Sequence, residues 1–301
     1  MTRGAPTPAT VRVRVPAKVN LALRVGPRRP DGFHDLATVF HAVGIDDYVL
    51  AAPSSGVSLT VTGPDAAAVP ADATNLAWRA AEALAAEAGM PADVALTIDK
   101  VIPVAGGMAG GSADAAAALV AYDALWGLRT PSRTLDRIAA SLGSDVPFAL
   151  RGGTAVGTGR GEALTTVFGH GRFHWVVVPS VGTGLSTPAV YAEYDRLRPT
   201  PPTPDASSVA DVVAACEAGS APQLADALCN DLQEAAVSLM PSLRDVLAHG
   251  TEHGALAGLV SGSGPTCVFL AASEDAAWDL SAAFPYAAVT SGPVAGAARV
   301  S

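Results

Sequence analysis

The sequence predicts an α+β fold divided between two lobes, and three observations support this prediction. The chain has 301 residues, which exceeds the usual size of one domain. Half of the residues are hydrophobic and 16% are charged, so the chain can bury a large core and is not generally disordered. Strand-like and helix-like segments follow one another without a strict βαβ rhythm, which favours α+β over a parallel α/β sheet.

Strand patterns open the chain. Residues 11–15 alternate with period two, and an apolar extended pattern at 19–25 follows Pro16. We predict further strands at 48–52, 57–62, 94–98 and 174–178, and a glycine-rich hairpin at 151–162. We place the lobe boundary near residue 167, which gives an N-terminal lobe of residues 1–167 and a C-terminal lobe of residues 168–301.

Helical patterns occupy the middle and the second half of the sequence. Residues 75–88 place apolar side chains on one face and end at Gly89, and residues 132–142 end at Gly143. We predict further helices at 113–126 with Ser112 as the N-cap, and at 209–217, 222–238, 241–249 and 273–283. The proline-rich stretch 199–208 is predicted to be a surface loop.

Composition excludes several classes of partner and location. Nineteen Lys and Arg residues against 28 Asp and Glu residues give a net charge of −9, which repels nucleic acid. Every apolar stretch is interrupted before the roughly 18 residues that a transmembrane helix needs. Residues 1–10 lack the apolar core of a signal peptide. We therefore expect a cytoplasmic protein with no nucleic-acid or membrane partner. Its three scattered cysteines are too few for a disulfide framework.

A glycine-rich segment carries the strongest chemical signal. It runs through Pro103, Val104, Ala105, Gly106, Gly107, Met108, Ala109, Gly110, Gly111, Ser112 and Ala113. Glycines let an oxyanion approach the backbone N–H groups, and the N-terminus of the following helix attracts negative charge. An anion site is therefore predicted, with a simple glycine-rich turn as the alternative. The spacing matches neither GxxxxGK[ST] nor GxGxxG, which excludes a P-loop and a Rossmann motif.

Further segments, in this order, give the chain a family resemblance. Residues 16–23, the glycine-rich segment, 142–148 and 261–267 together resemble the GHMP small-molecule kinase superfamily. The resemblance runs from about Val15 to Cys267. It implies a ribosomal protein S5 domain 2-like N-terminal lobe that binds ATP and a ferredoxin-like C-terminal lobe that binds substrate. The segment Pro30-Asp-Gly-Phe-His34 favours a cytidine diphosphate-linked sugar alcohol as the small-molecule substrate. A homoserine or mevalonate type of kinase, or a non-catalytic GHMP-like regulatory protein, are the alternatives.

The resemblance also implies a nucleotide site and a metal. ATP is expected along residues 103–113, with Asn75 and Lys100 lining its pocket. From the sequence alone, Asn75 fits a helix N-cap equally well, and Lys100 fits a solvated side chain. Mg²⁺ is expected with ATP, and Ser112 is a candidate direct or water-mediated ligand. Ala109 occupies a position where glycine is frequent in the family, and alanine tolerates positive φ poorly.

Catalytic and substrate-binding roles follow from the same resemblance. Asp145 is expected to accept the proton of the substrate hydroxyl, while Lys18 keeps that carboxylate ionised beside the transferred group. The alternative for Asp145 is an ordinary turn aspartate beyond a helix end. The substrate-binding candidates are Phe33 and Tyr191, which would stack on the cytosine, His34, which would hydrogen-bond it, and, more weakly, Asn20 and Thr187.

One motif points elsewhere. His249-Gly-Thr-Glu-His253 satisfies H-x-x-E-H, an inverted zinc-protease pattern. Because that motif requires a helix and Gly250 is expected to interrupt one, we do not predict a zinc site. Asp145 and the glycine-rich segment remain the centre of the predicted chemistry.

Overall fold

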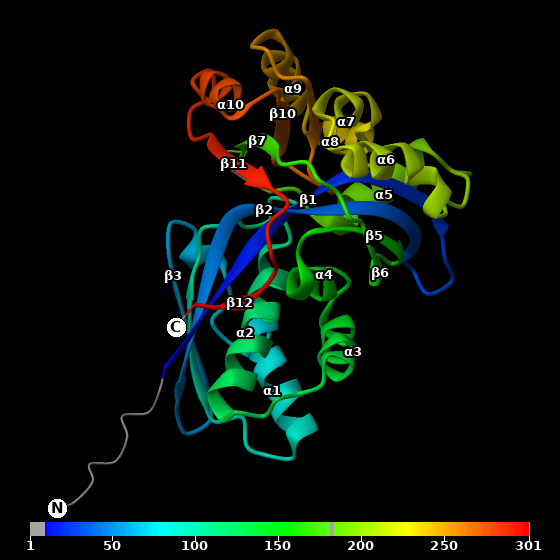
Figure 1. The fold of residues 1–301 in the computed structure, drawn as a ribbon. Coiled ribbons are helices and arrows are strands. Elements are labelled where there is room, and N and C mark those ends of the chain that lie inside the picture. The colour runs from blue at the N-terminus through cyan, green and yellow to red at the C-terminus, as the bar shows by residue number, and fades with distance from the viewer. Residues whose placement is uncertain (1–9, 181–183, 301) are drawn as a thin grey trace, which may run out of the picture.

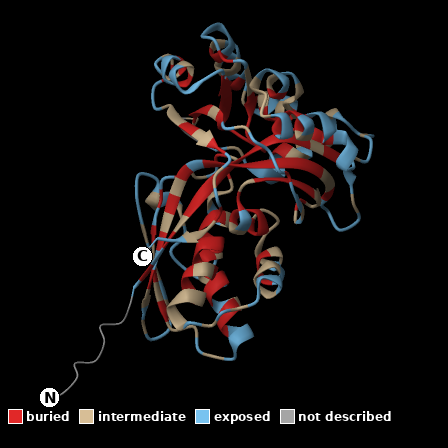
Figure 2. Ribbon diagram, in the orientation of Figure 1, coloured by how far each residue is buried: buried red, intermediate tan, exposed pale blue. Residues whose placement is uncertain are grey.

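The computed structural model describes residues 10–180 and 184–300. Residues 1–9, which belong to the stretch without a signal-peptide pattern, lie outside the described residues. Figure 1 shows the described chain as two groups of helices, α1–α4 and α5–α10, joined by the long strands β1 and β2. Buried residues follow these two strands and the interior of the first helical group (Figure 2). The α+β prediction is confirmed.

The larger sheet has eight described strands. They are β1 (Val11–Arg28), β2 (His34–Pro53), β3 (Val57–Thr62), β4 (Val94–Asp99), β5 (Thr154–Gly159), β6 (Ala163–Thr166), β8 (Cys229–Asn230) and β12 (Ala298–Arg299). The order is β12-β1-β2-β4-β3, while β5 pairs with β2 and β6, and β8 pairs with β1. We expected Pro16 to separate two strands, but β1 runs through it with a shift of register between Pro16 and Ala17. A register shift absorbs the ladder hydrogen bond that proline cannot donate.

The smaller sheet belongs to the second half of the chain. Its antiparallel order is β11 (Ala288–Gly292), β7 (Phe173–Val178), β10 (Cys267–Ala271) and β9 (Ala257–Val260). Two strands of this half, β8 and β12, return to pair with β1 of the larger sheet. The boundary near residue 167 stays a prediction, because the chain crosses between the sheets again after it.

Ten α-helices are described. They are α1 (Leu76–Ala88), α2 (Gly110–Trp126), α3 (Ser132–Leu142), α4 (Val146–Arg151), α5 (Thr187–Leu197), α6 (Ala210–Ala218), α7 (Ala221–Ala227), α8 (Gln233–Leu239), α9 (Ser242–Glu252) and α10 (Glu274–Ser281). Two short 3₁₀ helices cover Ala66–Ala68 and Ala206–Val209, the second ending the predicted proline-rich loop. None of the helices described is long and apolar enough to cross a membrane.

Two helix predictions were wrong for identifiable reasons. The predicted helix 222–238 is divided into α7 and α8 by β8, which pairs with β1. Gly250 does not interrupt α9, which runs through it to Glu252. A Cβ at this position would overlap the ring of Phe269, so glycine is present because the helix packs closely on β10. The glycine is therefore a close helix–sheet contact within a continuous helix.

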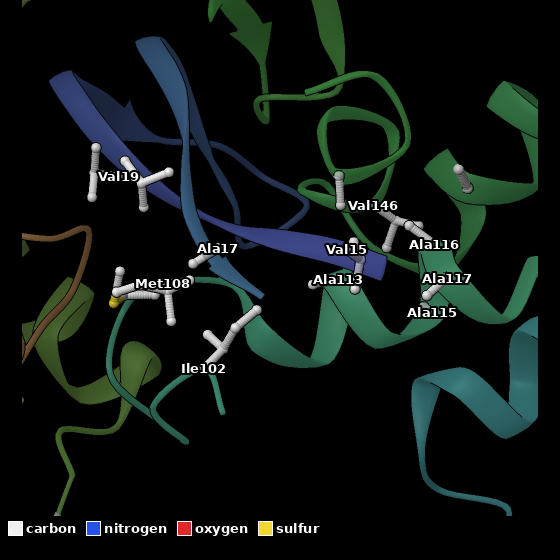
Figure 3. Packing of buried hydrophobic residues seen from close by; sticks show 14 of the residues in the cluster. Val15, Ala17, Val19, Ile102, Met108, Ala113, Ala115, Ala116, Ala117 and Val146 are labelled. Atoms are coloured by element: carbon white, nitrogen blue, oxygen red, sulfur yellow. The ribbon is translucent and has the colours of Figure 1, made fainter. Parts of the chain in front are cut away.

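Helix α2 is the centre of the first helical group. Its buried positions are mostly alanines, from Ala113 to Ala118, together with Leu119 and Tyr122. Small side chains allow α2 to lie close to β1, and Figure 3 shows Val15 and Ala17 of β1 beside this helix with Ile102 and Met108 at its N-terminal end. Burial of a side chain such as Ile102 or Met108 stabilises the fold by about 1.5–3 kcal/mol. This packing fixes the N-terminus of α2, where the glycine-rich segment begins its helix.

Candidate active site

The glycine-rich segment forms an irregular loop, residues 103–109, that leads into α2. Its backbone is left-handed at Ala105 (φ 53°), Gly107 (φ 77°) and Ala109 (φ 58°). Ala109 is the N-cap of α2, so the prediction that Ser112 caps the helix was wrong, and Ser112 lies in the first turn. The first N–H groups of a helix have no partners within it. The loop and helix therefore present backbone donors to an anion.

A second loop, residues 261–266 between β9 and β10, packs against the glycine-rich loop. Ser261, which follows β9, donates a hydrogen bond from its Oγ to the carbonyl of Gly107 at 3.1 Å. A Cβ at Gly107 would overlap the carbonyl oxygen of Ser261, and a Cβ at Gly106 would lie 2.6 Å from Thr266 Oγ1. Only glycine fits this close approach between the two halves of the chain.

The two loops border a cavity of about 980 Å³, which is at the upper end of the range for small-molecule sites. Every predicted site residue lines this cavity except Met108 and Ala113. The side chains of those two residues are buried in the core beneath the loop (Figure 3). The structure therefore brings the predicted catalytic, nucleotide and substrate residues into one place.

Lys18 and Asp145 meet beside the glycine-rich loop. Lys18 Nζ lies 3.5 Å from Asp145 Oδ2, and the side chains are 9% and 29% exposed. Lys18 Nζ also donates to the carbonyl of Gly107 at 3.1 Å. Asp145 precedes α4, a helix that we did not predict from the sequence. The Asp145 carboxylate is therefore partly exposed to the cavity, whereas the Lys18 ammonium is buried and bonded to the loop.

Asn20 holds Lys18 on its other side. Its Oδ1 accepts a hydrogen bond from Lys18 Nζ at 2.7 Å, and its Nδ2 donates to Thr38 Oγ1 at 2.8 Å. Thr38 donates in turn to the carbonyl of Ala22 at 2.6 Å. Buried polar groups need such partners. Asn20 therefore orients the ammonium of Lys18 through a chain of bonds along β1 and β2.

Asn75 and Lys100 use their polar atoms within the fold. Asn75 caps α1, accepting from Ala77 N at 2.8 Å and donating to the carbonyl of Pro70 at 2.7 Å. Lys100 is 2% exposed, so the alternative of a solvated side chain was wrong. Its ammonium lies between the carboxylates of Asp47 and Asp114. Burial alone would lower the pKa of Lys100, but these carboxylates outweigh burial and raise it. The ammonium already has two carboxyl partners.

One part of the cavity, its aromatic end, is lined by Phe33, His34 and Tyr191. Thr187, Tyr191 and Asp195 follow one another at intervals of four on α5, which places them on one face. The His34 ring lies 4.9 Å from the Tyr191 ring, and His34 Nε2 is 2.8 Å from Asp195 Oδ1. Burial raises the pKa of the Tyr191 hydroxyl above its usual value, and Asp145 adds to the shift. Asp195 was not predicted, although its spacing from Tyr191 could have identified it.

Two further contacts complete this end. Phe33 is 51% exposed, and the guanidinium of Arg160 lies 4.8 Å from its ring centre. Thr187 Oγ1 is 2.9 Å from Ser263 Oγ, which joins α5 to the second loop. Phe33 and Tyr191 thus offer rings to the same cavity.

The described residues contain no group of three or more His, Cys, Asp or Glu side chains arranged to hold a metal. Ser112 is half-buried at the start of α2 and lines the cavity together with Asp145. In the H-x-x-E-H segment, His249 Nε2 is 3.2 Å from the carbonyl of Ala283. The two histidine rings of that motif lie 4.0 Å apart, outside the cavity described above.

Comparisons with known proteins agree with this geometry. Two family models match, GHMP kinases N terminal domain over residues 75–153 and GHMP kinases C terminal over residues 212–288. A Rhodococcus jostii protein named 4-diphosphocytidyl-2-C-methyl-D-erythritol kinase is 55% identical over 296 residues, 96% of this chain and 95% of the relative. The chain belongs to the GHMP kinase family. Its site extends beyond the matched ranges, because Lys18 and His34 precede both.

Solved structures place this GHMP kinase in the same fold. A crystal structure of 4-(cytidine 5'-diphospho)-2C-methyl-D-erythritol kinase has a TM-score of 0.73 and 32% identity, covering 93% of this chain and 98% of that one. Homoserine kinase from Cytophaga hutchinsonii has a TM-score of 0.75 at 18% identity, with both chains fully covered. The two-lobed GHMP kinase fold is thus confirmed, and fold similarity alone does not distinguish these substrates.

Proposed function

We propose that the protein transfers the γ-phosphoryl group of ATP to the 2-hydroxyl of 4-diphosphocytidyl-2-C-methyl-D-erythritol, giving the 2-phosphate and ADP. This reaction belongs to non-mevalonate isoprenoid precursor biosynthesis, and we place it in the cytoplasm, where ATP is supplied. One observation carries the proposal: the Lys18–Asp145 pair lies in the same cavity as the glycine-rich loop and the His34–Tyr191–Asp195 group. The names of the relatives at about 55% identity support the same substrate.

Asp145 serves as the proton acceptor in this mechanism. The carboxylate is partly exposed to the cavity, while Lys18 lies 3.5 Å away at its rear. An ammonium held by Asn20 and the Gly107 carbonyl keeps a fixed position, so it orients the Asp145 carboxylate and stabilises the charge of the transferred group. The substrate hydroxyl proton passes to Asp145 as the new O–P bond forms and the bond between the γ-phosphorus and the departing ADP oxygen breaks.

The glycine-rich loop serves as the nucleotide site. Backbone N–H groups at residues 110–112 begin α2, where the helix dipole also favours the triphosphate. The close fit of Gly106 and Gly107 against the second loop holds the loop open toward the cavity. Mg²⁺ bound to ATP would neutralise phosphate charge, and Ser112 is the side chain that we propose to contact it.

The aromatic end serves as the cytosine site. Asp195 accepts a hydrogen bond from His34 Nε2, which selects the tautomer whose Nδ1 accepts from the amino group of the base. Phe33 and Tyr191 supply stacking surfaces. The glycine-rich loop, Asp145 and the aromatic residues line one cavity of about 980 Å³, so we expect the nucleotide and the substrate to meet beside Asp145.

An ADP-release assay tests this function. Purified protein with ATP and Mg²⁺ is supplied separately with 4-diphosphocytidyl-2-C-methyl-D-erythritol, homoserine and mevalonate. We expect turnover with the cytidine compound and none with the other two. Turnover with homoserine or mevalonate alone would reject the proposed substrate, and binding without turnover would favour a regulatory protein.

A further inference from the structure

Three buried charged side chains lie behind the glycine-rich loop. Lys100 Nζ donates to Asp47 Oδ2 at 2.5 Å and to Asp114 Oδ2 at 2.8 Å. Asp47, Lys100 and Asp114 are 0%, 2% and 1% exposed. They come from three different elements: β2, the end of β4 and the first turns of α2. Burying charges in this way costs free energy unless they are paired and hydrogen-bonded.

The hydrogen bonds of the cluster are unequal. Asp47 is fully engaged, because its Oδ1 also accepts from Val101 N at 2.6 Å and Ile102 N at 2.8 Å. Asp114 Oδ1 is buried and has no hydrogen-bond partner among the described residues. Burial raises the pKa of Asp114 to about 7, although Lys100 opposes the shift. Of the two carboxyl groups, Asp47 therefore has the more complete set of hydrogen bonds.

The side chains of Asp47 and Lys100 contact the backbone at the two ends of the glycine-rich loop. Asp47 holds the backbone of residues 101 and 102, immediately before the loop begins at 103. Gly110 follows the loop directly, and Lys100 Nζ packs against it. A Cβ at Gly110 would lie only 2.7 Å from that nitrogen. The cluster thus spans the distance between the start and the end of residues 103–109.

We propose that Asp47 is a positioning residue for nucleotide binding: with Lys100 and Asp114 it clamps the two ends of the 103–109 loop, so that the loop is shaped before ATP arrives. This inference rests on the proposed function, because it assigns the loop to ATP. A loop ordered in advance loses less conformational entropy when its ligand binds. Asp47 does not touch the cavity; it acts through the backbone of residues 101 and 102.

A purely structural role makes a different prediction. If Asp47 only stabilised the sheet, its loss would lower the melting temperature and affect both substrates equally. If it positions the loop, its loss weakens ATP binding and leaves the cytidine end unchanged. The neighbouring residue Asp46 provides the matched control, because it forms an ion pair with Arg14 at 2.8 Å and does not contact the loop.

Titration calorimetry with ATP and Mg²⁺ compares the wild type, Asp47→Asn and Asp46→Asn. In Asp47→Asn an amide nitrogen faces the Lys100 ammonium, so we expect the ATP dissociation constant to rise about tenfold or more. We expect the KM for the cytidine substrate to stay unchanged, and Asp46→Asn to bind ATP as the wild type does. Equal ATP binding by the wild type and Asp47→Asn overturns the inference. A wild type that does not bind ATP instead rejects the proposed function.

Amide hydrogen exchange on the wild type decides the matter if Asp47→Asn does not fold. The clamp requires the N–H groups of Val101 and Ile102 to be protected without ATP, because they are bonded to Asp47 in the free protein. The exposed fraction of Val101 is 54%. Without its hydrogen bond to Asp47, we therefore expect the Val101 amide to exchange rapidly. Slow exchange at both positions before ATP is added supports the clamp, and rapid exchange at either position overturns it.

Discussion

The side chains of Lys18 and Asp145 differ in their exposed fraction, at 9% and 29%. The ammonium has three oxygen neighbours, from Asn20, Gly107 and Asp145, and only the carboxylate of Asp145 is substantially open. A proton acceptor must be reachable by the substrate, whereas the cation that fixes it need not be. The residue that performs chemistry is therefore the more exposed member of the pair.

Replacing Asp145 with Asn tests this assignment. The amide keeps the shape of the side chain but cannot accept the proton, so we expect kcat to fall by about 10² to 10⁴ with ATP binding intact. Steady-state kinetics and calorimetry measure the two quantities. The control is Asp136→Asn, which breaks a nearby surface ion pair with Arg151. Near-normal turnover in Asp145→Asn would remove Asp145 from the mechanism.

His34 makes a separate prediction at the other end of the cavity. His34→Ala removes the group that Asp195 orients, so we expect the KM for the cytidine substrate to rise about tenfold or more, as a lost hydrogen bond in a buried site does. The kcat should change less. His170→Ala, on an exposed loop, is the matched control. An unchanged KM in His34→Ala would mean that the base is recognised elsewhere.

At the scale of elements, prediction from sequence succeeded best where a local apolar pattern and a terminal glycine mark the element. Helix α1 was predicted with its end at Gly89, and α3 with its end at Gly143. The first half of β2 was missed, because residues 37–43 are buried on both faces and show no alternation. Short α4 and β8 were missed because contacts with distant segments, not local pattern, form them. The same limit hid Asp47, whose partners lie more than 50 residues away.

The glycine-rich loop gives a prediction at this scale. In Gly107→Ala the new Cβ overlaps the Ser261 carbonyl, so we expect loss of ATP binding together with lower stability. Gly56→Ala is the matched control, because Gly56 has a similar φ of +75° and open space around it. The control should cost only the left-handed strain of about 1–2 kcal/mol. Chemical denaturation and calorimetry compare the two. Equal effects would show that strain, and not the contact between loops, matters.

On the scale of the whole molecule, the two halves share one site and one backbone framework. Asp231 of the second half pairs with Arg24 of β1 at 3.1 Å and accepts from Val25 N at 3.0 Å. The cavity draws its catalytic pair from the first half and α5 from the second. The sequence motifs predicted which residues would meet, because the family resemblance supplied that association. Their long-range pairing, such as β8 and β12 with β1, has no local signal.

The stability of the whole molecule should depend on pH through Asp114. An unfolded aspartate loses its proton near pH 4, whereas burial raises the pKa of Asp114 in the folded protein to about 7. Between these values the folded state binds more protons, so the free energy of unfolding falls as pH rises from about 4 to about 7. The charged groups that face Asp114 are Lys100 at the end of β4 and Asp47 of β2. The neighbouring carboxyl groups raise the pKa of Lys100 above its usual value, so its ammonium stays charged throughout that range.

Asp114→Asn removes this titration. Relative to the wild type, we expect the variant to gain stability on going from pH 5 to pH 8 by on the order of 1–3 kcal/mol, as measured by urea denaturation at each pH. Buried His41 contributes a slope of opposite sign, because burial lowers its pKa to about 3, but it is present in both proteins and cancels in the difference. A difference that does not change with pH would show that Asp114 is already ionised at pH 5, with Lys100 balancing two carboxylates.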